Sequence, residues 1–322
     1  MEAEGQTSRM RDFKYRDLAT AELRDWGWHL KDFRSESLRP IAERFLFNNI
    51  RSTTFATMPA WIAFEALREQ LWFDHATVKC GGTLDPDLTQ YHSSKITPEI
   101  EAEFNRLVFE HREIDKEKFR QLLREIGITY FEYQLAGEGK ATASNIDALF
   151  CAIILDSWTA FEYLVSDLWT VTMNAEDGTL ASRLESSGEL AKPNKTPETI
   201  KHNIKTSYGS YCVETRRVSF QKLENIKRLY AATFGKETRN LFDKIGDGYI
   251  HALHAFRNVF LHRAGEADEK FMEDVQRFPE FRGISVGDKL LPDGEQVKKM
   301  RDASVLLGRQ LIQVADSVLS PP

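Results

Sequence analysis

The sequence predicts an all-α protein built from two helical parts. Most of the 322 residues fall into segments whose apolar side chains recur every three to four positions, which is the period of an α-helix. A polar, glycine-bearing stretch, QLAGEGKATASN, separates an amino-terminal group of such segments from a carboxy-terminal group. We therefore expect a helical domain of unknown role at residues 1–140 and a second helical domain at residues 141–322.

Helices of the amino-terminal part are expected at residues 17–33, 35–50, 59–74, 97–115 and 116–127. Pro59 suits a first helical turn, because the N–H that proline lacks would be unbonded there. Thr97 is the expected N-cap of the next helix, with Pro98 at its first position. Residues 75–94 contain Gly-Gly and Asp-Pro and predict a loop.

Helices of the carboxy-terminal part are expected at residues 146–174, 219–235, 240–264 and 297–319. Between them we expect a mostly irregular segment at 175–217 and a short β-hairpin at 281–296. On the long helix, Glu162 lies at the edge of a broad apolar face.

Composition indicates an ordinary soluble globular protein, with 42% hydrophobic and 29% charged residues. The three cysteines lie far apart and form neither a disulfide framework nor a zinc site, which suits a reducing cytosol. The chain begins without an apolar signal-peptide region, and its longest apolar run, residues 148–155, is too short to span a bilayer. We expect a cytoplasmic protein that does not enter a membrane.

Charge is unevenly distributed although the net charge is only −6. The basic residues between Leu190 and Tyr230 are Lys192, Lys195, Lys201, Lys205, Arg216, Arg217, Lys222, Lys227 and Arg228. Only three acids oppose these nine, which favours a polyanionic partner. Tyr208 and Tyr211 lie among them and could stack on nucleic-acid bases. The alternatives are a solvated surface and an ordered loop packed on the amino-terminal part.

The helix that begins at Tyr249, YIHALHAFRNVFLHRAG, carries three of the eight histidines. On a helical wheel His251, Asn258 and His262 lie within about 40° of one another. Arg257 instead projects from the apolar arc.

A buried guanidinium needs an anionic partner, since it cannot lose its charge. Glu162 is the first candidate for that partner and Asp167 the second. One interpretation is therefore a structural Arg–Glu pair with histidines on the surface. A metal site of His251, His254 and His262 is not expected, because the helix offers neither a cysteine nor an acid to complete it.

The segment FRNVFLH resembles the R-x(4–6)-H motif of the HEPN superfamily, here in the form R-N-x-x-x-H. The upstream stretch LDSWTAFEYLVSDLW is similar to the first long helix of that family, which bears an acidic residue where Glu162 stands. The segment GISVGDKLLPDGEQV also resembles prokaryotic members. The resemblance covers roughly residues 145–322 and implies a HEPN-like helical bundle.

The resemblance implies a homodimer that acts as a metal-independent RNA endonuclease without a cofactor, as in toxins and antiviral-defence effectors. The matching catalytic residues are Arg257, Asn258 and His262, with Glu162 in a supporting role. Asn258 would fix the imidazole of His262 or bind ribose. Arg257 and His262 lie about 140° apart on the helix, so we expect the arginine of one copy to act with the histidine of the other.

RNA is the expected partner, and an antitoxin or sensor protein is a possible second one. The candidate RNA contacts are Lys201, Lys205, Arg216 and Arg217. The alternative function is a non-catalytic HEPN module for binding or assembly.

Overall fold

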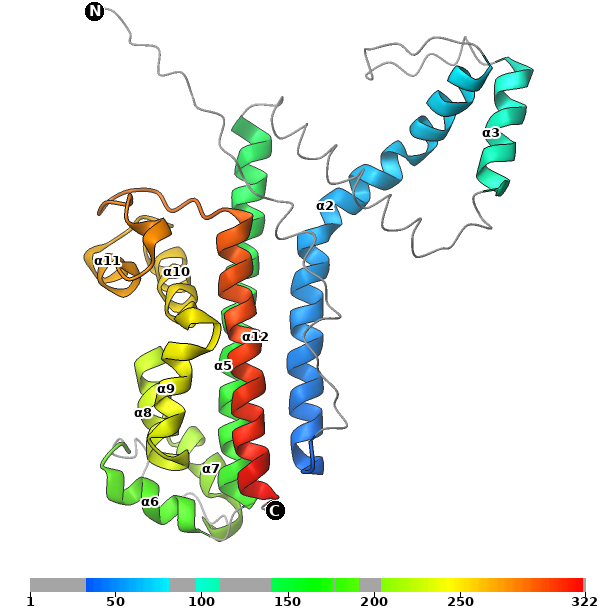
Figure 1. Ribbon diagram of the computed structural model, residues 1–322. Coiled ribbons are helices and arrows are strands. Elements are labelled where there is room, and N and C mark those ends of the chain that lie inside the picture. The colour runs from blue at the N-terminus through cyan, green and yellow to red at the C-terminus, as the bar shows by residue number, and fades with distance from the viewer. Residues whose placement is uncertain (1–32, 81–96, 111–139, 176–177, 191–203, 321–322) are drawn as a thin grey trace, which may run out of the picture. The chain divides into compact units, whose positions relative to one another are not determined.

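The computed structural model describes residues 33–80, 97–110, 140–175, 178–190 and 204–320, and this part of the chain is all-α (Figure 1). The chain divides into two compact units, Met1–Arg11 with Ala56–Ser144 and Asp12–Phe55 with Asn145–Pro322. One division, between Ser144 and Asn145, falls close to the boundary expected at residue 140. Among the described residues of the amino-terminal part, 33–55 group with the carboxy-terminal residues, whereas the domain expected at 1–140 would have included them.

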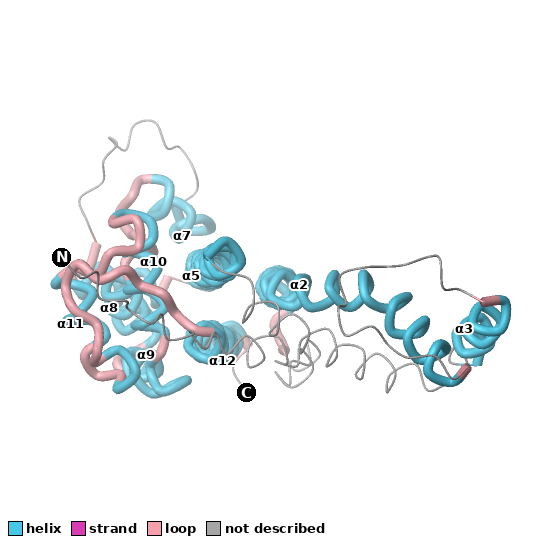
Figure 2. The backbone as a smooth tube through the Cα atoms, turned by 90° about the horizontal axis from the view of Figure 1, so that it is seen from above, coloured by secondary structure: helices cyan, strands magenta, loops and turns pink. Residues whose placement is uncertain are grey.

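The larger unit is a helical bundle. Its helices are the first part of α2 (Arg39–Lys79), α5 (Lys140–Ala175), α6 (Thr179–Ser187), α7 (Ile204–Glu214), α8 (Leu223–Phe234), α9 (Glu237–Lys244), α10 (Ile250–His262), α11 (Glu269–Val275) and α12 (Gly294–Leu319). Short 3-10 turns lie at η3 (Glu36–Leu38), η6 (Ile245–Gly248) and η7 (Pro279–Phe281). Figures 1 and 2 show α5 and α12 side by side, with the first part of α2 on one side of this pair and α8, α9 and α10 on the other.

Helix α5 forms the centre of this bundle because its buried side chains recur every three to four residues. They include Phe150, Ile153, Ile154, Trp158, Phe161, Leu164, Val165, Leu168 and Trp169. The indole N–H of Trp169 donates to Thr233 Oγ1 of α8 at 3.0 Å, and the Tyr230 hydroxyl donates to the Val165 carbonyl at 2.8 Å. These bonds satisfy polar groups that would be costly to bury alone.

Helices α2, α5 and α12 approach one another closely at Gly308 of α12. A Cβ atom there would lie 2.5 Å from the Phe45 ring and 2.7 Å from Leu164. At the rim, Arg44 and Arg51 of α2 pair with Asp167 and Asp156 of α5 at 2.8 Å. These pairs are partly exposed and contribute little each. The close packing at Gly308 therefore fixes this part of the bundle.

The structure differs from the sequence prediction at two places where a helix was expected to begin or to continue. Helix α2 runs continuously over 41 residues with Pro59 inside it, where we expected Pro59 to begin a helix. The proline removes a single hydrogen bond, which a helix of this length can lose. Conversely, the helix expected at 240–264 is interrupted at Gly246 and Asp247, whose φ angles of 57° and 51° lie in the left-handed region.

The segment expected to be mostly irregular, 175–217, contains α6 and α7. The hairpin expected at 281–296 is not seen there. That region instead forms one antiparallel bridge with the chain just after α10, between Glu266 and Lys289. The Ala267 N–H donates to the Asp288 carbonyl at 2.9 Å, and the Leu290 N–H donates to the Gly265 carbonyl at 2.7 Å.

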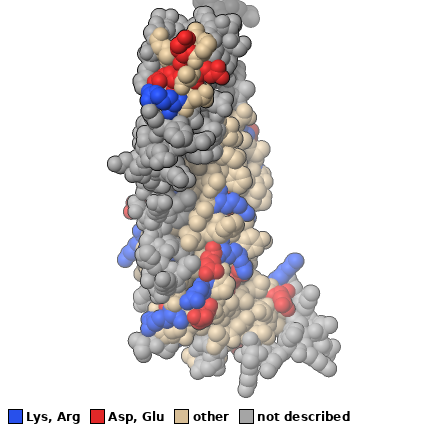
Figure 3. All heavy atoms as spheres, turned by 90° about the vertical axis from the view of Figure 1, so that its right-hand side faces the viewer, with Lys and Arg blue, Asp and Glu red and all other residues tan. Residues whose placement is uncertain are grey.

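The smaller unit contains the rest of α2 and α3 (Pro98–Glu110). Thr97 caps α3 as expected, because its Oγ1 accepts from the Ile100 N–H at 3.4 Å. Acidic side chains gather over α3 in the space-filling view (Figure 3). The helix expected at 116–127 lies outside the described residues.

By length and composition alone, Ser144–Ala175 could cross a membrane, with a mean hydropathy of 1.5. This stretch is longer than the continuous apolar run at residues 148–155, which by itself is too short to span a bilayer. Half of its most apolar 18-residue stretch is buried in the fold. The core helix of a soluble protein has the same length, composition and burial, so these properties are weak evidence for a membrane span. The carboxylates of Asp156, Glu162 and Asp167 lie 2.8, 3.9 and 2.8 Å from arginines of other helices.

Replacing Gly308 with valine should lower the free energy of unfolding by about 2 kcal/mol, because the added atoms overpack the contact with Phe45 and Leu164. Urea denaturation would measure the change. Gly283→Ala is the matched control, since a Cβ atom at Gly283 meets nothing within 4 Å. Equal stabilities of Gly308→Val and the wild type would show that the three helices are not closely packed here.

Candidate functional site

Arg257 reaches from α10 toward α5 and lies beside the carboxylate expected to be its partner. Its Nη2 is 3.9 Å from Glu162 Oε2, and its side chain is 18% exposed. The indole N–H of Trp158 donates to the same carboxylate oxygen at 2.9 Å. Asp167, the second candidate, pairs with Arg44 instead. The Arg257–Glu162 pair is thus present, although neither group is fully buried.

Asn258 connects Arg257 to a buried histidine. Its Oδ1 accepts from Arg257 Nη1 at 2.9 Å, and its Nδ2 lies 3.1 Å from His254 Nε2. Asn258 therefore orients the guanidinium of Arg257 and makes no hydrogen bond to His262, whereas the alternative expected for it, a contact to ribose, stays a prediction. The three side chains form a hydrogen-bonded row along α10.

His254 fills the space between α10, α5 and the start of α8. Its ring centroid is 4.8 Å from that of Trp158. The N–H of Leu223, the first residue of α8, donates to His254 Nε2 in a long hydrogen bond of 3.5 Å. The His254 ring thus accepts one of the free backbone N–H groups at the N-terminus of α8, where the N-cap residue Lys222 makes no side-chain hydrogen bond. Burial lowers the pKa of His254 to about 4, so the ring is neutral at pH 7.

His262 is the last residue of α10 and is exposed. Within the described part of the chain its imidazole makes no hydrogen bond or ion pair. The next residue, Arg263, pairs with Asp268 at 3.3 Å. The imidazole of His262 is therefore available to a ligand or to a second copy of the chain.

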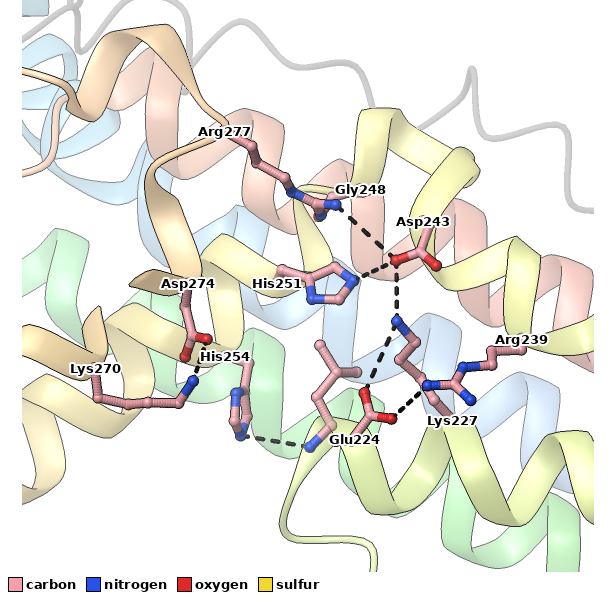
Figure 4. A network of polar contacts seen from close by, with 11 residues as sticks. Glu224, Lys227, Arg239, Asp243, Gly248, His251, His254, Lys270, Asp274 and Arg277 are labelled. Atoms are coloured by element: carbon pink, nitrogen blue, oxygen red, sulfur yellow. Dashed lines mark hydrogen bonds and ion pairs between the residues drawn. The ribbon is translucent and has the colours of Figure 1, made fainter. Parts of the chain in front are cut away.

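His251 points to a third place, a polar network between α8, α9 and α10 (Figure 4). Its Nε2 lies 2.9 Å from Asp243 Oδ1, and the buried Lys227 donates to the same oxygen at 3.0 Å. Burial and the nearby cations Arg277 and Lys227 lower the pKa of His251. The three histidines of α10 thus have separate surroundings. Among the described residues, no group of three or more His, Cys, Asp or Glu could hold a metal ion.

A groove of about 570 Å³ opens next to Glu162, between α5 and the segment that joins α7 to α8. Its lining includes Glu162, Tyr163, Ser166, Arg216, Ser219 and Phe220. A smaller hollow of about 190 Å³ shares Arg216 and Ser219 with it and adds Arg217 and Arg228. Glu162, the partner of Arg257, therefore lines the same groove as Arg216, which is far from it in sequence. Arg257 itself lines neither hollow.

Arg216 has an unusual backbone conformation, with φ at 56°. It follows α7 at the position where a glycine commonly ends a helix. The Arg216 N–H donates to the Val213 carbonyl at 3.0 Å and the Arg217 N–H to the Cys212 carbonyl at 2.9 Å, which is a Schellman motif. The Arg216 side chain is exposed and has no partner in the described part of the chain.

The other basic candidates differ in availability. Lys201 lies outside the described residues, and Lys205 belongs to α7 without a described side chain. Arg217 is 4.0 Å from Glu185. Lys227 is buried in the network around Asp243 and cannot reach a ligand.

Tyr208, one of the two tyrosines that could stack on a base or belong to an ordered loop, is buried. Its hydroxyl donates to Glu185 at 2.8 Å, and burial raises the pKa of Tyr208. Tyr211 packs beside it, with ring centroids 6.5 Å apart. Tyr163, which the sequence analysis did not single out, is 62% exposed and lines the groove.

No model of a known protein family, no curated protein and no solved structure matches this chain.

Replacing Arg216 with glycine should raise the free energy of unfolding by about 1 kcal/mol, because glycine adopts the left-handed region without steric cost. Urea unfolding measures the change. Arg217→Gly is the matched control, since its φ is not positive, and it should lose stability. A loss of stability in Arg216→Gly would mean that the side chain holds the loop.

Stability should fall as the pH falls from about 6.5 to about 4, because the unfolded chain binds a proton at His254 before the folded protein does. The full effect of this group is on the order of 2–3 kcal/mol. His254→Gln should remove that part of the slope in denaturation measured across this range. Groups common to both proteins, His251 among them, cancel in the comparison. Identical slopes would place His254 in contact with water.

Proposed function

We propose that this chain is a metal-independent endoribonuclease of the HEPN type that acts as a homodimer. The observation that carries the proposal is the exposed imidazole of His262, which has no partner among the described residues, on the helix that also holds Arg257 beside Glu162. Arg216 is exposed on the groove that Glu162 lines, has no partner within the described ranges, and supplies positive charge for a phosphate backbone.

The proposed reaction is attack of the ribose 2′-hydroxyl on the neighbouring phosphorus. The bond from the 2′-oxygen to phosphorus forms while the bond to the 5′-oxygen breaks, leaving a 2′,3′-cyclic phosphate and a 5′-hydroxyl. Histidine titrates near neutrality and can move the proton. The planar fork of arginine suits the phosphate oxygens as negative charge develops on them.

Two copies are proposed because Arg257 and His262 serve different surroundings within one chain. Arg257 is held toward α5 by Glu162 and Asn258, whereas His262 lies five residues further along at the end of α10. The guanidinium of one protomer would then act with the imidazole of its partner. Asn258 and Glu162 have positioning roles in this scheme.

The second candidate function is a non-catalytic binding module. The Asn258 side chain supports it, because that side chain accepts from Arg257 and lies against His254 and makes no hydrogen bond to His262. The three motif residues are therefore not assembled into one site within a single chain. In either case we propose a cytoplasmic protein that binds RNA. A role as a toxin or defence effector, with an antitoxin or sensor partner, belongs to the catalytic proposal.

Purified protein should cleave total cellular RNA in the presence of EDTA, and His262→Ala should slow cleavage roughly 10²–10⁴-fold. Arg257→Lys should be similarly impaired, because it keeps the charge and loses the fork. Since His262 is exposed, thermal unfolding of His262→Ala should match the wild type.

Arg282→Ala is the control for both variants, because Arg282 is exposed and borders neither hollow. The 2′,3′-cyclic end is identified by its resistance to a phosphatase that acts only on monoesters. Full activity of His262→Ala, or loss of activity in EDTA, would reject this mechanism. RNA binding without any cleavage would favour the binding module.

The protein should have about twice the chain mass of 37.1 kDa in solution. Multi-angle light scattering at tens of micromolar measures this directly. A monomer at that concentration would contradict the shared site.

A further inference from the structure

We propose that the groove beside Glu162 binds one guanine nucleotide of a single-stranded RNA, with the base against Glu162 and a phosphate on Arg216. This inference names the substrate preference of the proposed ribonuclease and in that sense rests on the proposed function. The binding site itself is argued from the groove alone.

The groove has the size and the chemistry of a ligand site. Its volume of about 570 Å³ lies within the range usual for small-ligand pockets. Its wall combines the aromatic residues Tyr163 and Phe220 with the hydroxyl groups of Ser166 and Ser219. Such a mixture suits a group with apolar faces and polar edges, as a nucleobase has.

Glu162 determines which base edge fits. The indole N–H of Trp158 donates to Oε2, which also lies 3.9 Å from Arg257 Nη2. Oε1 has no hydrogen-bond donor within the described part of the chain, so it remains open to a base edge. A carboxylate only accepts hydrogen bonds, so it prefers a base edge with adjacent donors. Guanine presents two, at N1 and at the 2-amino group. Adenine and cytosine place a ring acceptor beside the amino group, and uracil flanks its single N–H with two carbonyls.

Tyr163 and Arg216 account for affinity that does not depend on the base. The ring of Tyr163 is 62% exposed on the groove wall, where a base can stack on it. Arg216 stands at a backbone position that favours glycine, and its guanidinium has no partner among the residues that the structure describes. A side chain at such a position costs backbone strain, which can be offset when the side chain binds a ligand.

The test measures binding of short, labelled oligoadenylates that carry a single central G, A, C or U, by fluorescence anisotropy in EDTA. His262→Ala protein is used so that the RNA stays intact. The G-containing RNA should bind on the order of tenfold more tightly than the other three, the worth of a bidentate contact to a base. Adding Glu162→Gln should abolish that preference while retaining the affinity for the A-containing RNA.

Arg216→Gly should weaken binding to all four RNAs alike. It should also make the slope of log affinity against log salt concentration shallower by about one, because about one counterion fewer is released on binding. Arg282→Ala should change neither. Because Glu162→Gln could affect folding through Arg257, Ser219→Trp provides a second variant, which fills the groove from an exposed position and should weaken binding of every RNA. Equal affinities for the four RNAs, or a preference that survives both Glu162→Gln and Ser219→Trp, would overturn the proposal.

Cleavage by the wild-type protein is read in parallel, which separates the two proposals. A preference for G that depends on Glu162, without any cleavage, would reject the nuclease and retain the groove as a binding site. Cleavage without such a preference would reject the groove proposal and retain the nuclease.

Discussion

The contact of Arg257 with Glu162 connects the helix that carries the motif to the central helix of the bundle. An arginine cannot discharge, so its partial burial requires a carboxylate at this point of α5. The Trp158 indole N–H donates a hydrogen bond to the Glu162 carboxylate. On α10, the Asn258 side-chain oxygen accepts a hydrogen bond from the Arg257 guanidinium. These contacts link α10 to α5 at Glu162, which also lines the groove.

His254 extends the same arrangement to a third helix. Its neutral ring packs on Trp158 and accepts the N–H of Leu223, so the start of α8 is joined to α10 and α5 at one place. A histidine suits this position because it offers both a flat apolar face and a single acceptor. The histidines of α10 therefore have different roles: His254 joins three helices, whereas His262 is exposed and has no partner in the described ranges of the chain.

Local pattern predicted the helices and the partner of Arg257, because both follow from helical periodicity. Glu162 was found at the edge of an apolar face, and the structure places it beside Arg257. The breaks were not predictable in this way, since Pro59 continues a helix while Gly246 and Asp247 interrupt one. The groove was missed because its walls come from α5 and from residues some fifty positions later, which only the tertiary fold brings together.

The most direct test of the shared-site account is complementation between two inactive proteins. Arg257→Lys and His262→Ala are co-expressed, the dimers are purified, and RNA cleavage is measured beside each single variant. If Arg257 of one protomer acts with His262 of its partner, half of the dimers are mixed and each has one intact site, so about a quarter of wild-type activity returns. Co-expressed protein no more active than the single variants would contradict the account.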